Sequence, residues 1–177
     1  MQSIQTVSEN TIYVGASDRR LAKFENLFPI PRGVSYNAYV ILDEKTALLD
    51  TADASVGAQF LENVAAALDG RKLDYLIVDH MEPDHAAMIE AVLVRWPDLR
   101  LVVNAKTLPM LKMYFPTDSA AIDDALVVKE GDTLDLGKHK LTFVMAPMVH
   151  WPEVMMTFDT TTGTLFSAEF VDYIITY

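Results

Sequence analysis

This sequence contains no cysteine, and that absence excludes three common kinds of site. A chain without cysteine forms no disulfide bond, no cysteine-ligated iron–sulfur cluster and no thiolate zinc site. Long apolar runs are also missing, since no stretch approaches the roughly 20 residues of a membrane-spanning helix. The first ten residues lack the charged-then-apolar plan of a signal peptide. We therefore expect a cytoplasmic protein that does not associate with a membrane.

Positive charge is scarce as well. The chain has 14 Lys and Arg against 25 Asp and Glu, a net charge of −11, and basic residues occur at most in pairs such as Arg19-Arg20. A chain of this charge repels nucleic acid, so we expect no nucleic-acid partner. Its 51% hydrophobic and 22% charged residues are ordinary for a globular protein, and 177 residues can bury the core of one domain.

Only four histidines occur, and two of them fall in the most informative stretch, residues 80–85 (HMEPDH). This stretch contains four potential metal ligands. It follows the apolar run 73–78, which predicts a buried strand, and it precedes residues 86–96, where apolar side chains recur at helical spacing. The potential ligands therefore lie on a tight loop between a strand and a helix, with Pro83 suited to the first helical turn.

A metal site explains this cluster better than the ordinary alternatives do. Asp84 alone would be interpreted as a helix cap, and His80 alone as a surface residue. Four ligand-type residues at one junction favour metal binding, and carboxylates at Glu82 and Asp84 would offset the helix dipole, which opposes a cation. Imidazole-rich sites suit zinc, whereas mixed imidazole and carboxylate sites suit iron or manganese. We expect iron, with zinc as the alternative metal.

The loop resembles the His-x-His-x-Asp-His motif of the metallo-β-lactamase superfamily, with Glu82 in place of the second histidine. With a glutamate at this position, the loop resembles that of one branch of the superfamily, the flavodiiron proteins, which are oxygen and nitric oxide reductases. Further similar segments follow in the family's order over nearly the whole chain: 33–42, 46–51, 131–137, 146–152 and 164–167. The resemblance implies an α+β fold, the metallo-β-lactamase-like αββα sandwich, in which two sheets are each covered by helices.

The resemblance also implies a ligand set for two iron ions. The residues it assigns are His80, Glu82 and His150 to the first iron, Asp84 with His85 beside it to the second, and Glu169, where the family has an aspartate, as the bridge. Such a site would reduce oxygen to water or nitric oxide to nitrous oxide. Two alternatives remain: a diiron module without its own flavin that binds or senses oxygen, and a zinc-dependent hydrolase, against which Glu82 argues.

The family's last metal ligand and its FMN-binding flavodoxin-like domain would lie beyond Tyr177. The resemblance therefore implies that residues 1–177 form a partial diiron domain, incomplete at the C-terminal end and without a flavodoxin-like domain. Electrons would come from FMN on a missing domain or partner, or from a rubredoxin-type donor. The apolar and aromatic segment 169–177 predicts an interface, so we expect a homo-oligomer. Because the last imidazole ligand is missing from residues 1–177, we also expect weak binding of the second metal.

Other residues carry weaker signals. Asp50 follows a buried strand and is expected either to hold a ligand histidine through a hydrogen bond or to shape a turn. Trp151 is a candidate for the substrate pocket or the core, and Tyr36 for a donor near the site. Three polar residues are expected to be solvated: Glu153, Asp159 and His139. Residue patterns further predict strands at 11–15, 36–42, 47–49, 101–103, 141–147, 154–158 and 164–167, helices at 53–68 and 107–114, and an irregular loop at 23–32.

Overall fold

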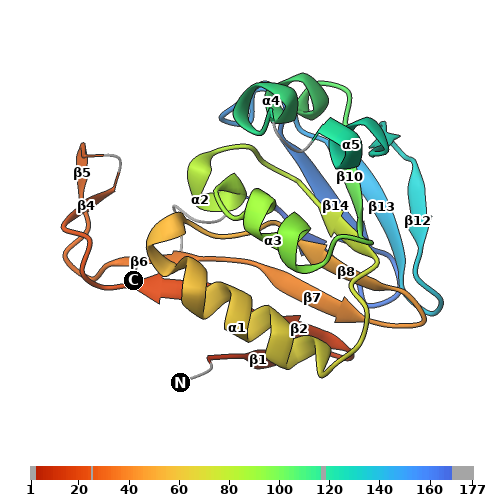
Figure 1. Cartoon of the computed structure of the whole chain (residues 1–177), viewed down its shortest axis with the longest axis horizontal. Helices are drawn as coiled ribbons and strands as arrows, with labels where there is room; N and C mark the ends of the chain where they lie inside the picture. The colour runs from red at the N-terminus through yellow and green to blue at the C-terminus, as the bar shows by residue number, and fades with distance from the viewer. Residues whose placement is uncertain (1–2, 25, 117–118, 169–177) are drawn as a thin grey trace.

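The structure, a computed structural model, describes residues 3–24, 26–116 and 119–168. These residues form a layer of helices, a seven-stranded sheet and a four-stranded sheet packed on one another (Figure 1). They supply three consecutive layers of the αββα sandwich expected from the sequence. Within the described residues, no helix covers the outer face of the smaller sheet. No described helix is long and apolar enough to cross a bilayer.

The larger sheet has the spatial order β1-β2-β7-β8-β9-β10-β11. Its strands are β1 (Gln5–Ser8), β2 (Thr11–Tyr13), β7 (Tyr39–Leu42), β8 (Thr46–Leu49), β9 (Tyr75–Ile77), β10 (Arg100–Asn104) and β11 (Leu126–Val128). The four strands from β8 to β11 run parallel, and the remaining pairs are antiparallel. Every residue of β8 is buried because helices cover one face of the sheet and the smaller sheet covers the other.

The smaller sheet is an antiparallel meander in chain order. Its strands are β12 (Thr133–Asp135), β13 (Lys140–Met145), β14 (Met155–Asp159) and β15 (Thr164–Phe166). Two short pairs stand apart: β3 (Ala16–Asp18) with β6 (Val34–Tyr36), and β4 (Lys23–Phe24) with β5 (Phe28–Pro29). The interpretation of residues 23–32 as wholly irregular was therefore wrong, although strands of two residues leave no periodic pattern to detect.

The helical elements are η1 (Ala54–Val56), α1 (Gly57–Leu68), α2 (Pro83–Ala86), α3 (Ile89–Arg95), α4 (Thr107–Tyr114) and α5 (Ser119–Asp123). The predicted helix at 53–68 is confirmed as η1 and α1, with Asp53 accepting the backbone N–H of Ser55 at its start. Along α1, Phe60, Val64 and Leu68 recur at intervals of four residues and are buried against the sheet. The helix predicted over 86–96, with Pro83 in its first turn, begins at Pro83 and is divided into α2 and α3.

Strand alternation builds two hydrophobic cores, one on each face of the larger sheet. Leu48 and Leu76 point to the helix side, where they join the cluster that contains Phe60. Their neighbours Leu49 and Ile77 point the other way and pack with Phe143 of the smaller sheet. Because each fully buried side chain of this size contributes roughly 1.5–3 kcal/mol, the two cores hold the three layers together.

Parallel pairing places the ends of three strands at one edge of the molecule. Asp50 follows β8, residues 79–82 follow β9, and Asn104 is the last residue of β10. Carboxyl ends of parallel strands meet at the same edge, which is where open sheets bind ligands. The loop between β13 and β14 reaches the same edge, since the backbone N–H of Met155 donates to the carbonyl of Asp79 at 3.0 Å.

Two residues expected to be solvated are buried at the far end of the smaller sheet. His139 is 2% exposed and Asp159 is 0% exposed, and His139 Nδ1 lies 2.8 Å from Asp159 Oδ2. The Thr162 hydroxyl also donates to Asp159, at 2.6 Å. Burial tends to raise the pKa of Asp159, but the hydrogen bonds from Thr162 and His139 hold that pKa below its ordinary value. The expectation was wrong because the β12–β13 turn is packed against the β14–β15 turn.

Replacing Asp159 by Asn is expected to lower the free energy of unfolding by about 1–3 kcal/mol at pH 7, because a charge-assisted hydrogen bond is lost inside the fold. The pKa of Asp159 is depressed in the folded chain, so its contribution is complete above the unfolded-state pKa of about 4. It disappears as the pH falls toward the lower folded-state pKa. Urea unfolding of both proteins between about pH 3 and 7 measures this difference.

Asp135 supplies the control. It forms an ion pair with Lys140 on the same sheet, but its side chain is 64% exposed. Asp135→Asn is expected to change stability by less than about 0.5 kcal/mol. A D159N chain as stable as wild type at pH 7 would contradict the structural role of the buried pair.

Candidate metal centre

The loop between β9 and α2 holds its polar side chains inside the protein. His80 is 0% exposed, Glu82 3% and His85 3%, although all three are polar. Glu82 is the extended N-cap residue of α2 and Pro83 follows at the first helical position, as predicted from the sequence. Because only a short turn separates β9 from α2, the backbone fixes the direction in which each of these side chains points.

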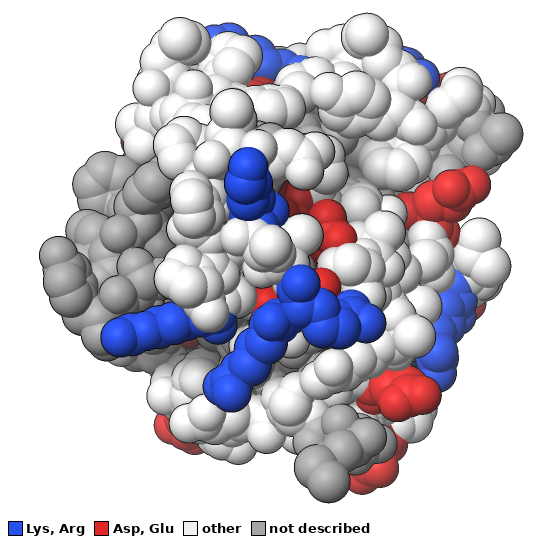
Figure 2. Space-filling view, turned by 90° about the vertical axis from the view of Figure 1, so that its left-hand side faces the viewer, with Lys and Arg blue, Asp and Glu red and all other residues white. Residues whose placement is uncertain are grey.

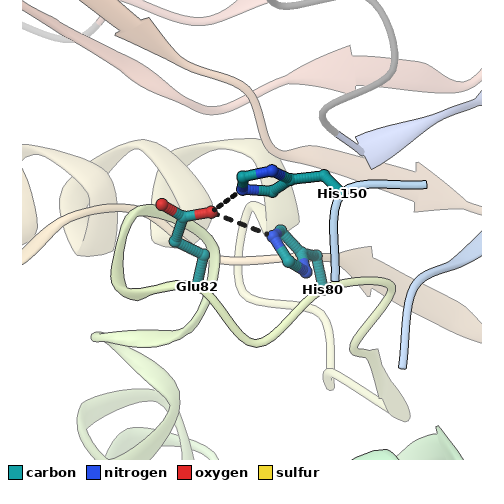
Figure 3. A group of neighbouring side chains, drawn as sticks. All are labelled: His80, Glu82 and His150. Carbon is teal, nitrogen blue, oxygen red and sulfur yellow. Dashed lines mark hydrogen bonds and ion pairs between the residues drawn. The ribbon is translucent and has the colours of Figure 1, made fainter. Parts of the chain in front are cut away.

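Three side chains from two loops converge in this region (Figure 3). Glu82 Oε2 lies 3.2 Å from His80 Nε2 and 2.9 Å from His150 Nε2, and both contacts end on the same carboxylate oxygen. One donor atom from each residue lies within 4.8 Å of the others. Two imidazoles and one carboxylate around a common point form a mixed nitrogen and oxygen donor set, which fits iron or manganese and also admits zinc.

His150 reaches this group from the loop between β13 and β14. It is 48% exposed and has a φ of +74°, and Met148 two residues earlier has a φ of +64°. Left-handed backbone costs roughly 1–2 kcal/mol for a residue with a side chain, so the loop holds His150 inward at some expense of strain. Trp151 packs edge-on against His80, with ring centroids 5.3 Å apart. Trp151 therefore lies directly beside the group formed by His80, Glu82 and His150.

Asp84 and His85 lie next to the first group. The ring of His85 is centred 5.2 Å from that of His80, and His85 Nε2 lies 3.8 Å from Asp84 Oδ2. Asp84 Oδ1 is buried and has no hydrogen-bond partner among the described residues. Burial is the main reason why the pKa of Asp84 is raised. A buried oxygen without a partner requires an explanation, and a cation next to it would supply one.

Glu169 was expected to bridge the two metals, and it lies outside the described residues, as does the remainder of the segment 169–177. Within the described residues, the group that could hold a metal ion consists of His80, Glu82 and His150, and Asp84 and His85 lie beside it.

Asp50 lies behind His85, on the side away from Asp84. Its Oδ2 is 3.0 Å from His85 Nδ1, and its Oδ1 accepts the backbone N–H groups of Asp79 and His80 at 2.8 and 3.4 Å. This contact fixes the imidazole so that Nε2 is directed toward Asp84. A cavity of about 280 Å³ reaches Asp50 and Asp79 from the side of β15.

Glu153 occupies the equivalent position behind His80, and sequence reasoning missed it. Its Oε1 lies 2.8 Å from His80 Nδ1 and accepts the backbone N–H of Met81 at 3.1 Å. Glu153 is 2% exposed, so its interpretation as a solvated surface charge was wrong. Burial tends to raise the pKa of Glu153, but the hydrogen bond from His80 and the backbone N–H groups keep that pKa below its ordinary value. An acidic residue three positions after a histidine expected to be a ligand was the available signal.

The charge of Glu153 also affects His80. Burial tends to lower the pKa of His80, but the hydrogen bond to Glu153 and the negative charges of Glu153 and Asp50 together raise that pKa above its ordinary value.

Tyr36 and Asp79 complete the surroundings. Tyr36 is 3% exposed, and its burial, together with the negative charges of Asp53 and Asp84, raises its pKa to about 12. Asp79, which sequence reasoning also missed, accepts the hydroxyl of Thr157 at 2.8 Å. Burial, followed by the negative charge of Asp50, raises the pKa of Asp79 well above its ordinary value. Both residues pack around the ligand loops and lie outside the three-residue ligand group.

The surface on one side of the molecule is basic despite the net charge of −11. Figure 2 shows Lys and Arg side chains gathered around a recess in which Asp and Glu side chains are visible. This face lies on the side of the β4–β5 hairpin in Figure 1. Arg19, Arg20, Lys23 and Arg32, from this part of the chain, are all exposed.

Comparisons with known proteins identify the family of this chain. The family described as "ODP family beta lactamase" matches residues 34–176. The protein named "Nitric oxide reductase" from Moorella thermoacetica is 36% identical over 154 residues, covering 86% of this chain and 38% of that protein. The "Anaerobic nitric oxide reductase flavorubredoxin" of Klebsiella pneumoniae is 36% identical over 163 residues, covering 91% of this chain and 33% of that protein. The chain thus spans about a third of the length of these curated relatives.

Solved structures confirm the α+β metallo-β-lactamase-like fold. The flavodiiron protein from Giardia intestinalis matches with a TM-score of 0.86 and 27% identity, over 94% of this chain and 40% of that one. The rubredoxin oxygen:oxidoreductase from Desulfovibrio gigas matches with a TM-score of 0.82 and 31% identity, over 89% of this chain and 38% of that one. Both matches cover nearly all of this chain and less than half of the other.

Proposed function

Because this chain belongs to the flavodiiron branch of the metallo-β-lactamase-like proteins, we propose that it binds two iron ions and reduces oxygen to water or nitric oxide to nitrous oxide. The observation that carries this proposal is the position of Glu82, whose carboxylate lies between the imidazoles of His80 and His150. A carboxylate at that point favours iron over the all-histidine set that suits zinc.

The residues around the site fit such a centre. His80, Glu82 and His150 would hold the first iron, Asp84 and His85 the second, and Glu169 would bridge them. Iron supplies the electrons for reduction when it is bound. The unpartnered Oδ1 of Asp84 and the buried carboxyl group of Glu82 would offset the charge of two bound cations.

The chain's own side chains would also control access to the reaction. Trp151 covers one side of His80, and the side chains of His80, Glu82 and His85 are nearly inaccessible to water. A dry site keeps water from competing with a small neutral substrate. Half-exposed His150 stands at the outer side of the group, where oxygen or nitric oxide would approach.

Sustained turnover requires an electron donor, and we propose a flavodoxin-like domain with FMN or a rubredoxin-type protein. One solved relative is named as a rubredoxin oxygen:oxidoreductase. The basic face of Figure 2 would attract a donor with an acidic surface, because complementary charges steer association. Without such a donor, the same centre would bind oxygen without turning over.

Iron content is the direct test of the proposal. We expect the chain, purified without oxygen from cells supplied with iron, to carry iron with the Mössbauer parameters of nitrogen and oxygen ligation. After reduction with dithionite, it should consume added oxygen or nitric oxide in proportion to its iron. Stoichiometric zinc with no iron, despite abundant iron, would instead support a zinc hydrolase. Reversible oxygen uptake without consumption would support the oxygen-binding module.

A further inference from the structure

Glu153 connects three loops at the base of the ligand group. Its side chain accepts hydrogen bonds from His80 Nδ1 and from the backbone of Met81, both in the loop after β9. Its own backbone carbonyl accepts the side-chain amide of Asn104, at the end of β10, at 2.5 Å. It follows His150 in the third loop by three residues. The position of Glu153 is therefore fixed independently of any ligand.

The two carboxylate oxygens of Glu153 have unequal surroundings. Oε1 accepts two hydrogen bonds, whereas Oε2 is buried and has no hydrogen-bond partner among the described residues. A buried oxygen without a partner destabilises the fold by roughly 1–3 kcal/mol. Fold stability alone therefore does not explain a glutamate at this position. The hydrogen bond from His80 to Oε1 offers another explanation.

The contact determines which nitrogen of His80 carries hydrogen. An ionised carboxylate that already accepts the N–H of Met81 can only accept from the imidazole as well, so Nδ1 must donate. Nε2 is then the nitrogen directed at Glu82, 3.2 Å away, and in the neutral imidazole with hydrogen on Nδ1 it is Nε2 that carries the lone pair. Without Glu153 the ring could rotate or take the other tautomer, and neither arrangement presents Nε2 to the site.

We propose that Glu153 is a positioning residue that holds His80 with Nε2 directed at the metal and, through its negative charge, strengthens His80 as a donor. This inference rests on the proposed function, because it assigns Glu153 a role only if His80 is a ligand. Partners behind a ligand histidine typically raise metal affinity by about 10- to 100-fold. They also favour the more highly charged state of the metal.

The chain contains a matched pair that separates this role from ordinary burial. His139 Nδ1 lies 2.8 Å from Asp159 Oδ2, the same distance as that between His80 Nδ1 and Glu153 Oε1. Both pairs are buried, but neither His139 nor Asp159 belongs to the group of potential ligands. Asp159→Asn therefore removes one buried carboxylate behind an imidazole without touching the site.

The test uses the 177-residue chain with Glu153→Gln and Asp159→Asn. Glutamine keeps the size of the side chain and an oxygen acceptor but removes the charge, so the chain should still fold. Anaerobic titration with Fe(II) gives the affinity, and titration with Co(II) gives an absorption spectrum that depends on the ligand geometry. Thermal unfolding of each metal-free chain measures stability separately.

We expect E153Q to bind Fe(II) about 10- to 100-fold more weakly than wild type and to change the Co(II) spectrum. D159N should lower stability while leaving the Fe(II) affinity within about threefold of wild type. An E153Q affinity within threefold of wild type, with an unchanged Co(II) spectrum, would overturn the inference and leave the proposed function standing. Equal weakening in D159N would also overturn it, since the effect would then follow stability. A wild-type chain that binds neither ion would overturn the proposed function itself.

Discussion

Replacing Glu82 by Ala is expected to lower the affinity for Fe(II) by about 100- to 1,000-fold. Four-ligand structural zinc sites bind with roughly 10–16 kcal/mol, so one ligand accounts for about 3–4 kcal/mol of binding free energy. Glu82 is also the residue that contacts both His80 and His150, and its loss leaves two imidazoles without the carboxylate between them. Anaerobic Fe(II) titration of the wild-type and variant chains measures the difference.

Glu62 provides a matched control on α1, because it is an exposed carboxylate outside the ligand group. Glu62→Ala changes the net charge by the same amount and is expected to leave the Fe(II) affinity within about twofold. If Glu82→Ala also retained wild-type affinity, Glu82 would not be a ligand. The mixed donor set on which the iron assignment rests would then be lost.

Replacing Glu82 by His is expected to reverse the metal preference. The site would then present three imidazoles, the donor set that suits zinc, and it would lose the buried negative charge that favours iron. We expect the ratio of bound iron to bound zinc to fall by at least about tenfold, a difference of 1.4 kcal/mol in relative binding free energy. Loading both chains from equimolar Fe(II) and Zn(II) without oxygen, followed by elemental analysis, measures this ratio.

The comparison between Glu82→His and Glu82→Ala isolates the reason for selectivity. Both variants remove the charge, but only the histidine restores a third donor. Weak binding of both metals by E82A and strong zinc binding by E82H would establish that donor type sets the preference. An unchanged iron-to-zinc ratio in E82H would mean that the shape of the cavity, and not this carboxylate, selects the metal.

Local patterns predicted the elements whose pattern spans several residues. The helix that contains Phe60, Val64 and Leu68 and the loop that follows β9 were both found from spacing and turn chemistry. The short pairs β3–β6 and β4–β5 were missed because two or three residues are too few to show a repeated alternation of apolar and polar side chains. Strand β11 was missed for the same reason, although it completes the edge of the larger sheet.

The same limit applies to the candidate site, where contacts between residues close in sequence could be predicted and contacts between distant residues could not. His80, Glu82, Asp84 and His85 are close in sequence, so their proximity in space could be predicted. The contact between Glu153 and His80 joins residues 73 positions apart, and no local pattern encodes it. Acidic residues are usually exposed, so only the folded arrangement of three loops could reveal that this one is buried. His150 likewise entered the ligand set through the family resemblance and not through its own surroundings.

The ligand group spans both sheets, which ties metal binding to the folding of the whole domain. His80 and Glu82 follow a strand of the larger sheet, whereas His150 lies between two strands of the smaller one, 68 residues from Glu82. Contacts of such sequence separation form late in folding, since the chain between them must first be ordered. An ion at 100 times its dissociation constant would stabilise the folded state by about 2.7 kcal/mol. Losing that ion would speed hydrogen exchange at amides between the sheets, far from any ligand.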